Sequence, residues 1–452
     1  MCDILLVNSR SPLSISGLVQ EYIKIQPLGL QYLSACLQKE RYEVMGVDLF
    51  NVSERIERFR SVVQTKNFKV IGISSMTESS NNALRIARLC KQVSPRSIIV
   101  MGGPHVTFMT TETLRNAEVD FVIRGEGERS FLRLVDYIIR DIGSLSELDG
   151  VSYRNGAEIV HNRDVSPIED LDALPFPDRQ LFTGFGERSY IGNISTTRGC
   201  AGKCVFCAAS ALSGSNYRMR SAGSIVEEIV QLRSDNQVRH IFFVDDTFTV
   251  SRKRLTEFCE MMINKRIRMP WSAEARVDTV TEEILELMKR SGCNGLQFGV
   301  ESGSQGIVDK TRKGIRLERI HKLALKANKL GIKLMCSFII GHPDDTVDTI
   351  EDTVRFAEDL QKRFKANCLI SMMTPFPGTY LHDHLEEFGI QIVDDDFDNY
   401  HFNNPVIETK NLTTDQIRAL HFDAIVRLSK SRDLVMSEQK GILRRLADRA
   451  SV

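Results

Sequence analysis

Three cysteines lie close together in one stretch of the chain, with the spacing Cys-x-x-x-Cys-x-x-Cys: Cys200, Cys204 and Cys207. Thiolates bind iron–sulfur clusters, and a cubane cluster takes one ligand on each of its four irons. Because no fourth cysteine is nearby, one iron would stay open to an exogenous ligand, which suits catalysis better than electron storage. The stretch therefore favours a catalytic [4Fe-4S] cluster.

Two other interpretations of these cysteines are open. A zinc ion prefers paired C-x-x-C ligands with a second pair downstream, and no second pair follows here. Free cysteine is often a core residue, so three unrelated buried thiols are the other alternative. The chain has ten cysteines among 452 residues. At that frequency, a match to the spacing is expected by chance roughly 0.01 times or less in such a chain. The spacing itself is therefore evidence for a common site.

The stretch resembles the radical S-adenosylmethionine (radical SAM) superfamily, whose cysteine loop carries an aromatic residue just before the last cysteine, here Phe206. The resemblance implies that the open iron binds the amino and carboxylate groups of S-adenosyl-L-methionine (SAM). It also implies that an electron from the cluster cleaves SAM to a 5'-deoxyadenosyl radical. A flavodoxin or ferredoxin would supply that electron.

The composition agrees with an enzyme of the cytoplasm. Acidic and basic residues balance at 59 each, so nothing favours a nucleic-acid partner or an anionic membrane surface. No apolar stretch approaches the roughly 18 residues that cross a bilayer, and the first residues are unlike a signal peptide. Scattered cysteines, three of them in a reduced cluster, favour a reducing compartment over a disulfide scaffold.

The first third of the chain alternates between short runs rich in Val and Ile and helical stretches. The expected strands are residues 3–8, 43–48, 70–74, 98–102 and 120–124, and the expected helices are 27–40, 52–66, 80–93 and 111–117. This alternation predicts a mostly parallel sheet covered on both faces, a flavodoxin-like (Rossmann-type) domain over residues 1–140. Ligands of such domains bind beyond the carboxyl ends of the strands.

Small and polar residues follow three of these strands. Paired glycines let a ligand approach the backbone closely, although ordinary turns between strands and helices use the same residues. The candidate ligand-binding residues are Ser74, Met76, Thr77, Gly102, Gly103, Pro104, His105, Glu126 and Gly127.

With Pro27, Gly29 and Leu33, these strand ends resemble the cobalamin-binding domain that precedes the barrel in many radical SAM enzymes, the class B type. The D-x-H-x-x-G motif is missing after the first strand, so no histidine is expected below the cobalt. His105 lies on the wrong loop for that role and is expected to be a turn residue or a contact to the corrin edge. A domain that has lost its cobalamin is the alternative.

The rest of the chain predicts a connector, a barrel and a helical region. Residues 141–188 are rich in turn signals, with a small hairpin at 151–160 around Asn155 and Gly156. Residues 189–385 predict a partial (β/α)6 barrel with strands at 191–196, 240–245, 271–277, 295–301, 333–341 and 368–374, and helices near 224–235, 252–265, 281–291, 317–330 and 346–360. Residues 386–452 predict a helical cap that begins at Thr413 or Thr414 and ends in a basic amphipathic stretch, 439–449.

The resemblance extends to the carboxyl ends of the barrel strands, where relatives bind SAM. A carboxylate suits the ammonium group of SAM, and an arginine suits its carboxylate. An acid at the fourth strand would accept hydrogen bonds from the ribose, and backbone at the fifth would lie against the adenine. In strand order, the candidates are Asp245, Asp246, Arg276, Gly299, Glu301, Ser302, Ile340 and Pro375. Structural ion pairs at strand ends are the alternative.

Four other residues carry weaker signals. Tyr217 could donate a hydrogen atom to a product radical, although packing is the simpler role, and Glu274 could manage protons. Arg218 and Arg220 could hold a substrate or cofactor anion, or form a solvated basic turn.

If the resemblance covers both domains, it implies methylation of an unactivated carbon or a phosphinate phosphorus in a small-molecule substrate. Cobalamin would receive a methyl group from one SAM, and a second SAM would give the radical that removes a substrate hydrogen. The alternative keeps the radical without methylation, in the dehydration of a polyol, a rearrangement or a cyclisation. A non-catalytic corrinoid or iron–sulfur sensor is the third hypothesis.

Overall fold

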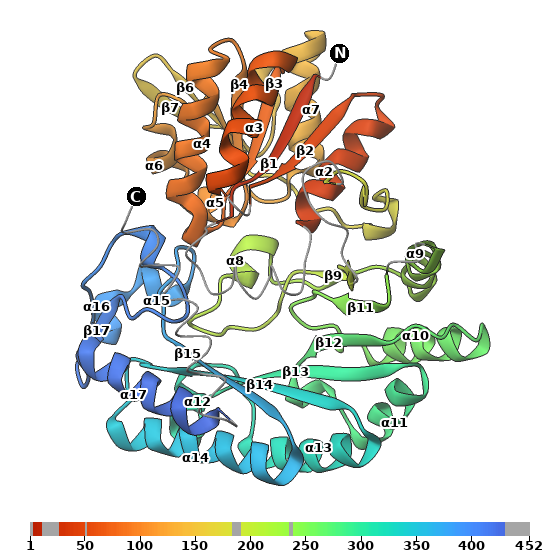
Figure 1. Ribbon diagram of the computed structural model, residues 1–452, viewed down its shortest axis with the longest axis vertical. Helices are drawn as coiled ribbons and strands as arrows, with labels where there is room; N and C mark the ends of the chain where they lie inside the picture. The colour runs from red at the N-terminus through yellow and green to blue at the C-terminus, as the bar shows by residue number, and fades with distance from the viewer. Residues whose placement is uncertain (1–2, 11–26, 50–51, 183–190, 235–237, 430–452) are drawn as a thin grey trace.

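The computed structural model describes residues 3–10, 27–49, 52–182, 191–234 and 238–429. They form an N-terminal α/β lobe and a barrel lobe, with β9 and α8 between them (Figure 1). The predicted fold class is confirmed in both lobes. The basic stretch 439–449 lies outside the described residues.

The N-terminal lobe contains a seven-stranded sheet in the order β2-β1-β3-β4-β5-β6-β7. Its strands are β1 (Ile4–Asn8), β2 (Val44–Asp48), β3 (Val70–Ser74), β4 (Ile98–Gly102), β5 (Phe121–Ile123), β6 (Val151–Asn155) and β7 (Glu158–His161). The first five are parallel, as predicted, while β6 and β7 are the predicted hairpin. The hairpin pairs antiparallel to β5 and so extends the sheet, a contact that the turn signals alone do not reveal.

Helices cover both faces of this sheet, as expected for parallel strands that are apolar throughout. The side chains of β1 from Ile4 to Val7 are fully buried. One core lies under α3 (Val52–Lys66), α4 (Ser80–Val93), α5 (Pro104–Phe108) and α6 (Thr110–Leu114), and the other under α2 (Leu28–Lys39) and α7 (Gly127–Arg140). The helix predicted at 111–117 is confirmed in part as α6, and the short helix α5, separated from it by a turn at Met109, was not predicted.

The barrel lobe contains six parallel strands in the order β15-β14-β13-β12-β11-β8. They are β8 (Ile191–Ile194), β11 (His240–Phe243), β12 (Trp271–Ala275), β13 (Cys293–Glu301), β14 (Lys333–Ile340) and β15 (Asn367–Met372). Because β15 and β8 stand at opposite edges, the sheet is an open, partial barrel.

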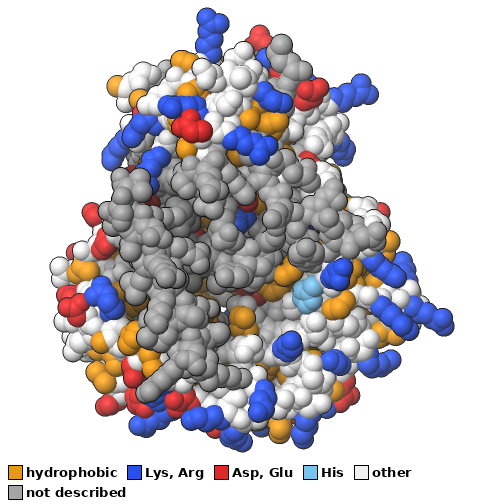
Figure 2. Space-filling view, in the orientation of Figure 1, with side chains coloured by type: hydrophobic (Ala, Val, Ile, Leu, Met, Phe, Trp, Pro, Cys, Tyr) orange, Lys and Arg blue, Asp and Glu red, His pale blue; other side chains and the backbone are white. Residues whose placement is uncertain are grey.

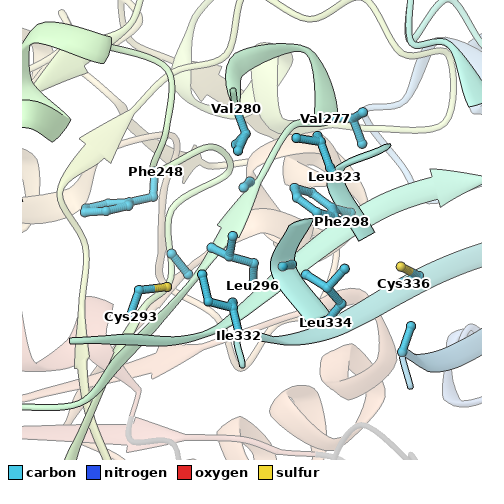
Figure 3. Packing of buried hydrophobic residues seen from close by; sticks show 14 of the residues in the cluster. Phe248, Val277, Val280, Cys293, Leu296, Phe298, Leu323, Ile332, Leu334 and Cys336 are labelled. Atoms are coloured by element: carbon cyan, nitrogen blue, oxygen red, sulfur yellow. The ribbon is translucent and has the colours of Figure 1, made fainter. Parts of the chain in front are cut away.

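The outer face of this sheet is covered by helices that alternate with the strands. They are α9 (Ala222–Ser234), α10 (Arg252–Asn264), α11 (Glu282–Arg290), α12 (Gln305–Lys310), α13 (Leu317–Leu330) and α14 (Val347–Phe364). Figure 3 shows the apolar side chains between the two layers, with Leu296 and Phe298 from β13 beside Leu334 from β14. This packing fixes the strands so that their carboxyl ends point toward the N-terminal lobe (Figure 1).

The region after β15 is not helical throughout. It contains α15 (Tyr380–Asp383), α16 (Leu385–Phe388), α17 (Thr414–Leu428) and an unpredicted hairpin of β16 (Ile390–Ile392) and β17 (Ile407–Thr409). Thr413 caps α17 in a capping box with Gln416, as predicted. The ring of His421 lies 2.9 Å from the Ile370 carbonyl, so α17 packs against β15.

The same region contacts the N-terminal lobe. The ring of Phe397, in the 3-10 turn η5 (Phe397–Asn399), lies edge-on to His105 at 4.7 Å. Asn81 donates to Asp396 over 2.7 Å, and Arg85 pairs with Asp398 at 3.0 Å. The two lobes are therefore held together at this side by a small apolar contact and two polar ones.

No helix in the described part of the chain is long and apolar enough to cross a membrane. On the face seen in Figure 2, both lobes carry basic and acidic side chains, in keeping with equal numbers of the two in the sequence.

Gly378 tests the interlobe packing. It has φ +85°, and a Cβ there would enter the ring of Phe108 on α5. We expect Gly378→Ala to cost about 1 kcal/mol of backbone strain and about 1–3 kcal/mol of overpacking, seen as a lower thermal midpoint and faster proteolysis between the lobes. Gly156→Ala is the control, because Gly156 has φ +63° but open space around it. Equal midpoints for the two variants would contradict the packing argument.

Candidate active site and cofactor sites

The three predicted metal ligands lie on a loop of residues 199–208, here called the cluster loop, which follows β8. The loop is flanked by a two-stranded ribbon, β9 (Thr197–Arg198) and β10 (Arg218–Met219). Gly199 starts the loop with φ +85°, and a Cβ there would overlap the carbonyl of Asn216. Only glycine fits that position, which explains the Gly-Cys pair at the start of the motif.

The sulfur atoms have donors suited to thiolates. The backbone N–H of Gly202 donates to Cys200 Sγ over 3.4 Å, and that of Ala209 donates to Cys207 Sγ over 3.5 Å. A Cβ on Gly202 would lie 3.2 Å from Cys200 Sγ and 3.8 Å from Cys204 Sγ. The two sulfurs thus approach the same small space, which fits an anionic iron–sulfur cluster.

Among the described residues, no three His, Cys, Asp or Glu side chains are close enough to hold a single metal ion. A cubane cluster needs no such convergence, because each thiolate binds a different iron. Burial raises the pKa of Cys204, while Lys313 and Arg276 lower it, and burial raises the pKa of Cys207 to about 11. Metal binding must therefore release protons from these thiols.

Asp245 and Asp246 are adjacent but lie in different surroundings. Asp245 is 2 % exposed and accepts hydrogen bonds from the backbone of Thr196 at 2.5 Å and of Thr197 at 2.8 Å. Its oxygens are thus used within the protein, and it positions the backbone that leads into the cluster loop. Asp246 lines a cavity instead, so it is the carboxylate of the pair that a ligand can reach.

Arg276 is directed partly toward its own loop. Its guanidinium pairs with both oxygens of Asp278, at 3.0 and 2.9 Å, and donates to the Lys313 carbonyl over 2.8 Å. Its third nitrogen lies 3.9 Å from where a Cβ of Gly202 would stand. The guanidinium therefore faces the cluster loop with one edge.

Glu301 lies at a bulge near the end of β13, with φ +71°. Such a conformation in a residue with a side chain is strained and often marks a functional site. Its carboxylate pairs with Lys313, directly over Gly299.

The remaining predicted SAM contacts are buried. Ser302 bonds to Thr353 at 3.0 Å, and the Ile340 carbonyl accepts from Met373 at 2.8 Å. Pro375 is buried as well, and Phe206 contacts the ring of His342 edge-on at 6.2 Å. The Ser302 hydroxyl and the Ile340 carbonyl are therefore already hydrogen-bonded within the protein.

Glu274, on β12, has a strongly perturbed carboxyl group. Burial, followed by the charges of Asp246 and Asp245, raises its pKa to about 7, and Lys313 acts against them. Tyr217, the other predicted catalytic residue, has its hydroxyl 3.5 Å from Cys200 Sγ. Burial and this sulfur raise the pKa of Tyr217 to about 12. Tyr217 thus lies against the cluster loop, and Glu274 lies beside the acids that follow β11.

A cavity of about 550 Å³ lies between the carboxyl ends of the two sheets. Of the predicted ligand residues of the N-terminal lobe, seven line it: Ser74, Met76, Gly102, Gly103, Pro104, Glu126 and Gly127. Gly103 has φ +107°, and a Cβ there would lie 2.7 Å from the Ser75 carbonyl. The glycines therefore keep the wall of the cavity at backbone level.

Thr77 and His105 do not line this cavity. The His105 ring is 3.3 Å from the Thr77 hydroxyl and contacts Phe397, and burial lowers its pKa to about 4. His105 is thus a neutral interlobe contact outside this cavity, and a contact to the corrin edge stays a prediction.

The barrel lobe supplies the opposite wall of the cavity. Apart from Asp246, the sequence did not indicate the residues of this wall. Its residues there are Ser195, Thr197, Arg198, Leu212, Ser213, Val244 and Asp246. The others have no assigned role in a known motif. The one signal that could have indicated them is their position in the sequence, close to the cysteine motif or to the end of the second barrel strand.

Arg218 and Arg220 do not form the predicted anion site or a solvated turn. They are 6 % and 4 % exposed. Arg218 pairs with Glu126, and Arg220 pairs with Glu228. Both alternatives are wrong, because a buried guanidinium must find a carboxylate inside the protein.

Comparison with known proteins agrees with this geometry. The family described as "Radical SAM superfamily" matches residues 194–357, and the "B12 binding domain" matches residues 22–135. An uncharacterized methyltransferase of Pyrococcus horikoshii is 30% identical over 398 residues, which cover 87% of this chain and 85% of that protein. The chain belongs to the radical SAM superfamily, and a B12-binding domain precedes its radical SAM domain.

Two further proteins are similar to the chain. An anaerobic magnesium-protoporphyrin IX monomethyl ester cyclase of Rubrivivax gelatinosus is 28% identical over 84% of this chain and 70% of that protein. The structure of the radical S-adenosylmethionine methyltransferase TsrM of Kitasatospora setae, with cobalamin and a [4Fe-4S] cluster bound, superposes with a TM-score of 0.74. It is 16% identical and covers 94% of this chain and 88% of that one, so it shows a shared fold.

The chain is therefore an enzyme, and its two domains assign its cofactors. The radical SAM domain takes a [4Fe-4S] cluster and SAM, and the B12-binding domain takes cobalamin. The residues that hold each cofactor stay predictions, as do the domain boundaries.

The Asp245–Asp246 pair offers a matched test of the site. We expect Asp245→Asn to weaken the hydrogen bonds from the backbone of Thr196 and Thr197, because an amide oxygen is a weaker acceptor than a carboxylate. Iron content after reconstitution should fall at least twofold, because the backbone before the cluster loop is then held less firmly. Asp246→Asn should keep the wild-type iron content. Equal iron in both variants would contradict the positioning role of Asp245.

Glu274 predicts a pH dependence of stability. Its pKa is about 7 in the folded protein against 4.5 ordinarily, so the folded state binds the proton more tightly. Stability is then lost as pH rises from about 4.5 to about 7, at about 1.4 kcal/mol per unit of pKa difference. Glu274→Gln removes this loss.

We expect Glu274→Gln to be more stable than the wild type by about 2–3 kcal/mol at pH 8 and nearly equal to it at pH 5, measured by denaturant titration. Glu318→Gln, at an exposed carboxylate on α13, should show the same small effect at both pH values. A Glu274→Gln effect that did not change with pH would refute the assignment.

Proposed function

We propose that the chain is a cobalamin-dependent radical SAM methyltransferase. It would abstract a hydrogen atom from a small-molecule substrate and place a methyl group there, with a flavodoxin or ferredoxin as the reductant. The observation that carries the proposal is the cavity between the two lobes, whose walls come from the strand ends of the B12-binding domain and from residues beside the cluster loop.

When bound, the cluster and SAM supply a carbon radical, and cobalamin supplies a methyl group. The protein's own contribution is to bring these groups to one space and exclude water from it. Ser195, Thr197 and Arg198 follow β8 and face the cavity from the cluster side, while Gly102 and Gly103 face it from the other.

The carboxylates at the barrel strand ends support binding of a cation. The charges of Asp246 and Glu301 both act on Glu274, with Lys313 as the opposing charge. Such a group favours the sulfonium and ammonium charges of SAM, because a cation relieves the repulsion among the acids. Arg276, with one edge toward Gly202, is suited to the SAM carboxylate.

The test is anaerobic reconstitution with iron, sulfide and hydroxocobalamin, followed by desalting, a visible spectrum and metal analysis. We expect roughly four irons and one cobalt per chain, and turnover should yield S-adenosylhomocysteine together with 5'-deoxyadenosine. Retention of iron without cobalt would rule out methylation by this route.

A second candidate is radical chemistry without methyl transfer, such as cyclisation. The similarity to the magnesium-protoporphyrin ester cyclase over most of both chains supports it. This candidate predicts 5'-deoxyadenosine without S-adenosylhomocysteine, so the two products separate the proposals.

A further inference from the structure

Two arginines and two glutamates connect the lobes beside the cavity. Arg198 and Arg218 face each other as partners in the β9–β10 ribbon. Glu126 and Glu128 lie at the start of α7 in the N-terminal lobe. We call these four residues the junction. Its members belong to different lobes, and three of them, Arg198, Glu126 and Glu128, line the cavity.

The contacts of the junction are close and buried. Arg198 donates to both oxygens of Glu128, one of them at 3.2 Å, and lies 3.4 Å from Glu126. The Arg218 guanidinium lies 2.6 Å from the other carboxylate oxygen of Glu126. The two form an ion pair, but their angle does not meet the criterion for a hydrogen bond. All four side chains are at most 17% exposed.

The connector between the lobes joins the same group. The backbone N–H of Ile168 donates to Glu126 over 2.8 Å, and the Ile168 carbonyl accepts from Arg218 at 2.9 Å. The Arg198 guanidinium also lies over the ring of Tyr32 on α2, 5.7 Å from its centroid. Buried charges with this many partners hold one arrangement, because removal of any partner leaves an uncompensated charge.

The junction is also attached to the cluster site. Arg198 is separated from the ligand Cys200 by Gly199 alone. Tyr217, adjacent to Arg218 in the chain, contacts Cys200 Sγ. The cluster loop has no helix or strand of its own, and Cys200 is held at its backbone by the Gly214 carbonyl at 3.0 Å. A cluster bound by this loop would therefore hold the ribbon, and through it the wall of the cavity.

We infer that Arg198 is a positioning residue that couples the two metal cofactors, so that cluster binding and cobalamin binding strengthen each other. The inference rests on the proposed cobalamin dependence. Coupling between two sites is reciprocal, because each ligand stabilises the arrangement that the other needs. The junction connects the two sites in this way. One wall of the cavity is attached to the cluster loop, and the other wall contains the strand ends of the B12-binding domain.

The test compares hydroxocobalamin affinity in cluster-containing and cluster-free full-length protein by anaerobic titration. In the wild type we expect the cluster to tighten binding by a factor between about 5 and 150. In Arg198→Gln and in Glu128→Gln this factor should fall toward one, and the double variant should add little to either. A role in folding alone would weaken both forms equally and leave the factor unchanged.

Arg85→Gln is the matched control. Arg85 also pairs with an acid of the other lobe, Asp398 at 3.0 Å, but it lines neither the cavity nor the cluster loop, so the factor should match the wild type.

Two outcomes would overturn the coupling alone. One is a factor of one in the wild type. The other is an unchanged factor in an Arg198→Gln variant that keeps the iron content and circular dichroism of the wild type. Absence of hydroxocobalamin binding to either wild-type form would overturn the proposed function and the coupling with it. Should Arg198→Gln not fold, Glu128→Gln decides, because it removes a charge and keeps the side-chain shape.

Discussion

The buried carboxylate of Asp245 is the contact on which the active site depends. It stands at the end of β11 and accepts from the backbone of Thr196 and Thr197, at the end of the neighbouring strand β8. Arg254 completes the group with hydrogen bonds to the Thr196 carbonyl at 2.9 Å and the Phe248 carbonyl at 2.8 Å. The backbone that enters the cluster loop is thus held by two buried charged groups that both bond to Thr196, and a buried charge is stable only when all its partners are in place.

The electrostatics of the two walls of the site differ for a physical reason. In the barrel, burial and the charges of Asp246 and Asp245 raise the pKa of Glu274 while Lys313 acts against them, and such an acidic group favours a cation. Beside the cavity, Glu126 and Glu128 are paired with arginines, and Arg218 and Arg198 hold the pKa of Glu126 below its usual range against the effect of burial. The first group is left ready for a ligand, whereas the second is used to join the lobes.

Much of the fold follows from local patterns. The parallel strands of both sheets occur at the predicted apolar runs, and the N-cap at Thr413 was one of two that the sequence predicted. The cysteine motif and the strand ends also indicated the cluster loop and part of one cavity wall, because parallel strands bring their carboxyl ends to a common edge.

What the sequence did not reveal are contacts between segments far apart in the chain. Arg218 and Arg220 carry no local sign of burial, and Glu126, the partner of Arg218, becomes its neighbour only once the lobes meet. Likewise Asp245 and Asp246 are equivalent in a motif, yet successive positions leaving a strand point to opposite sides, one into the protein and one into the cavity. A motif therefore identifies the chemical groups available at a strand end, while the packing of the second lobe decides which of them remain free to bind a ligand.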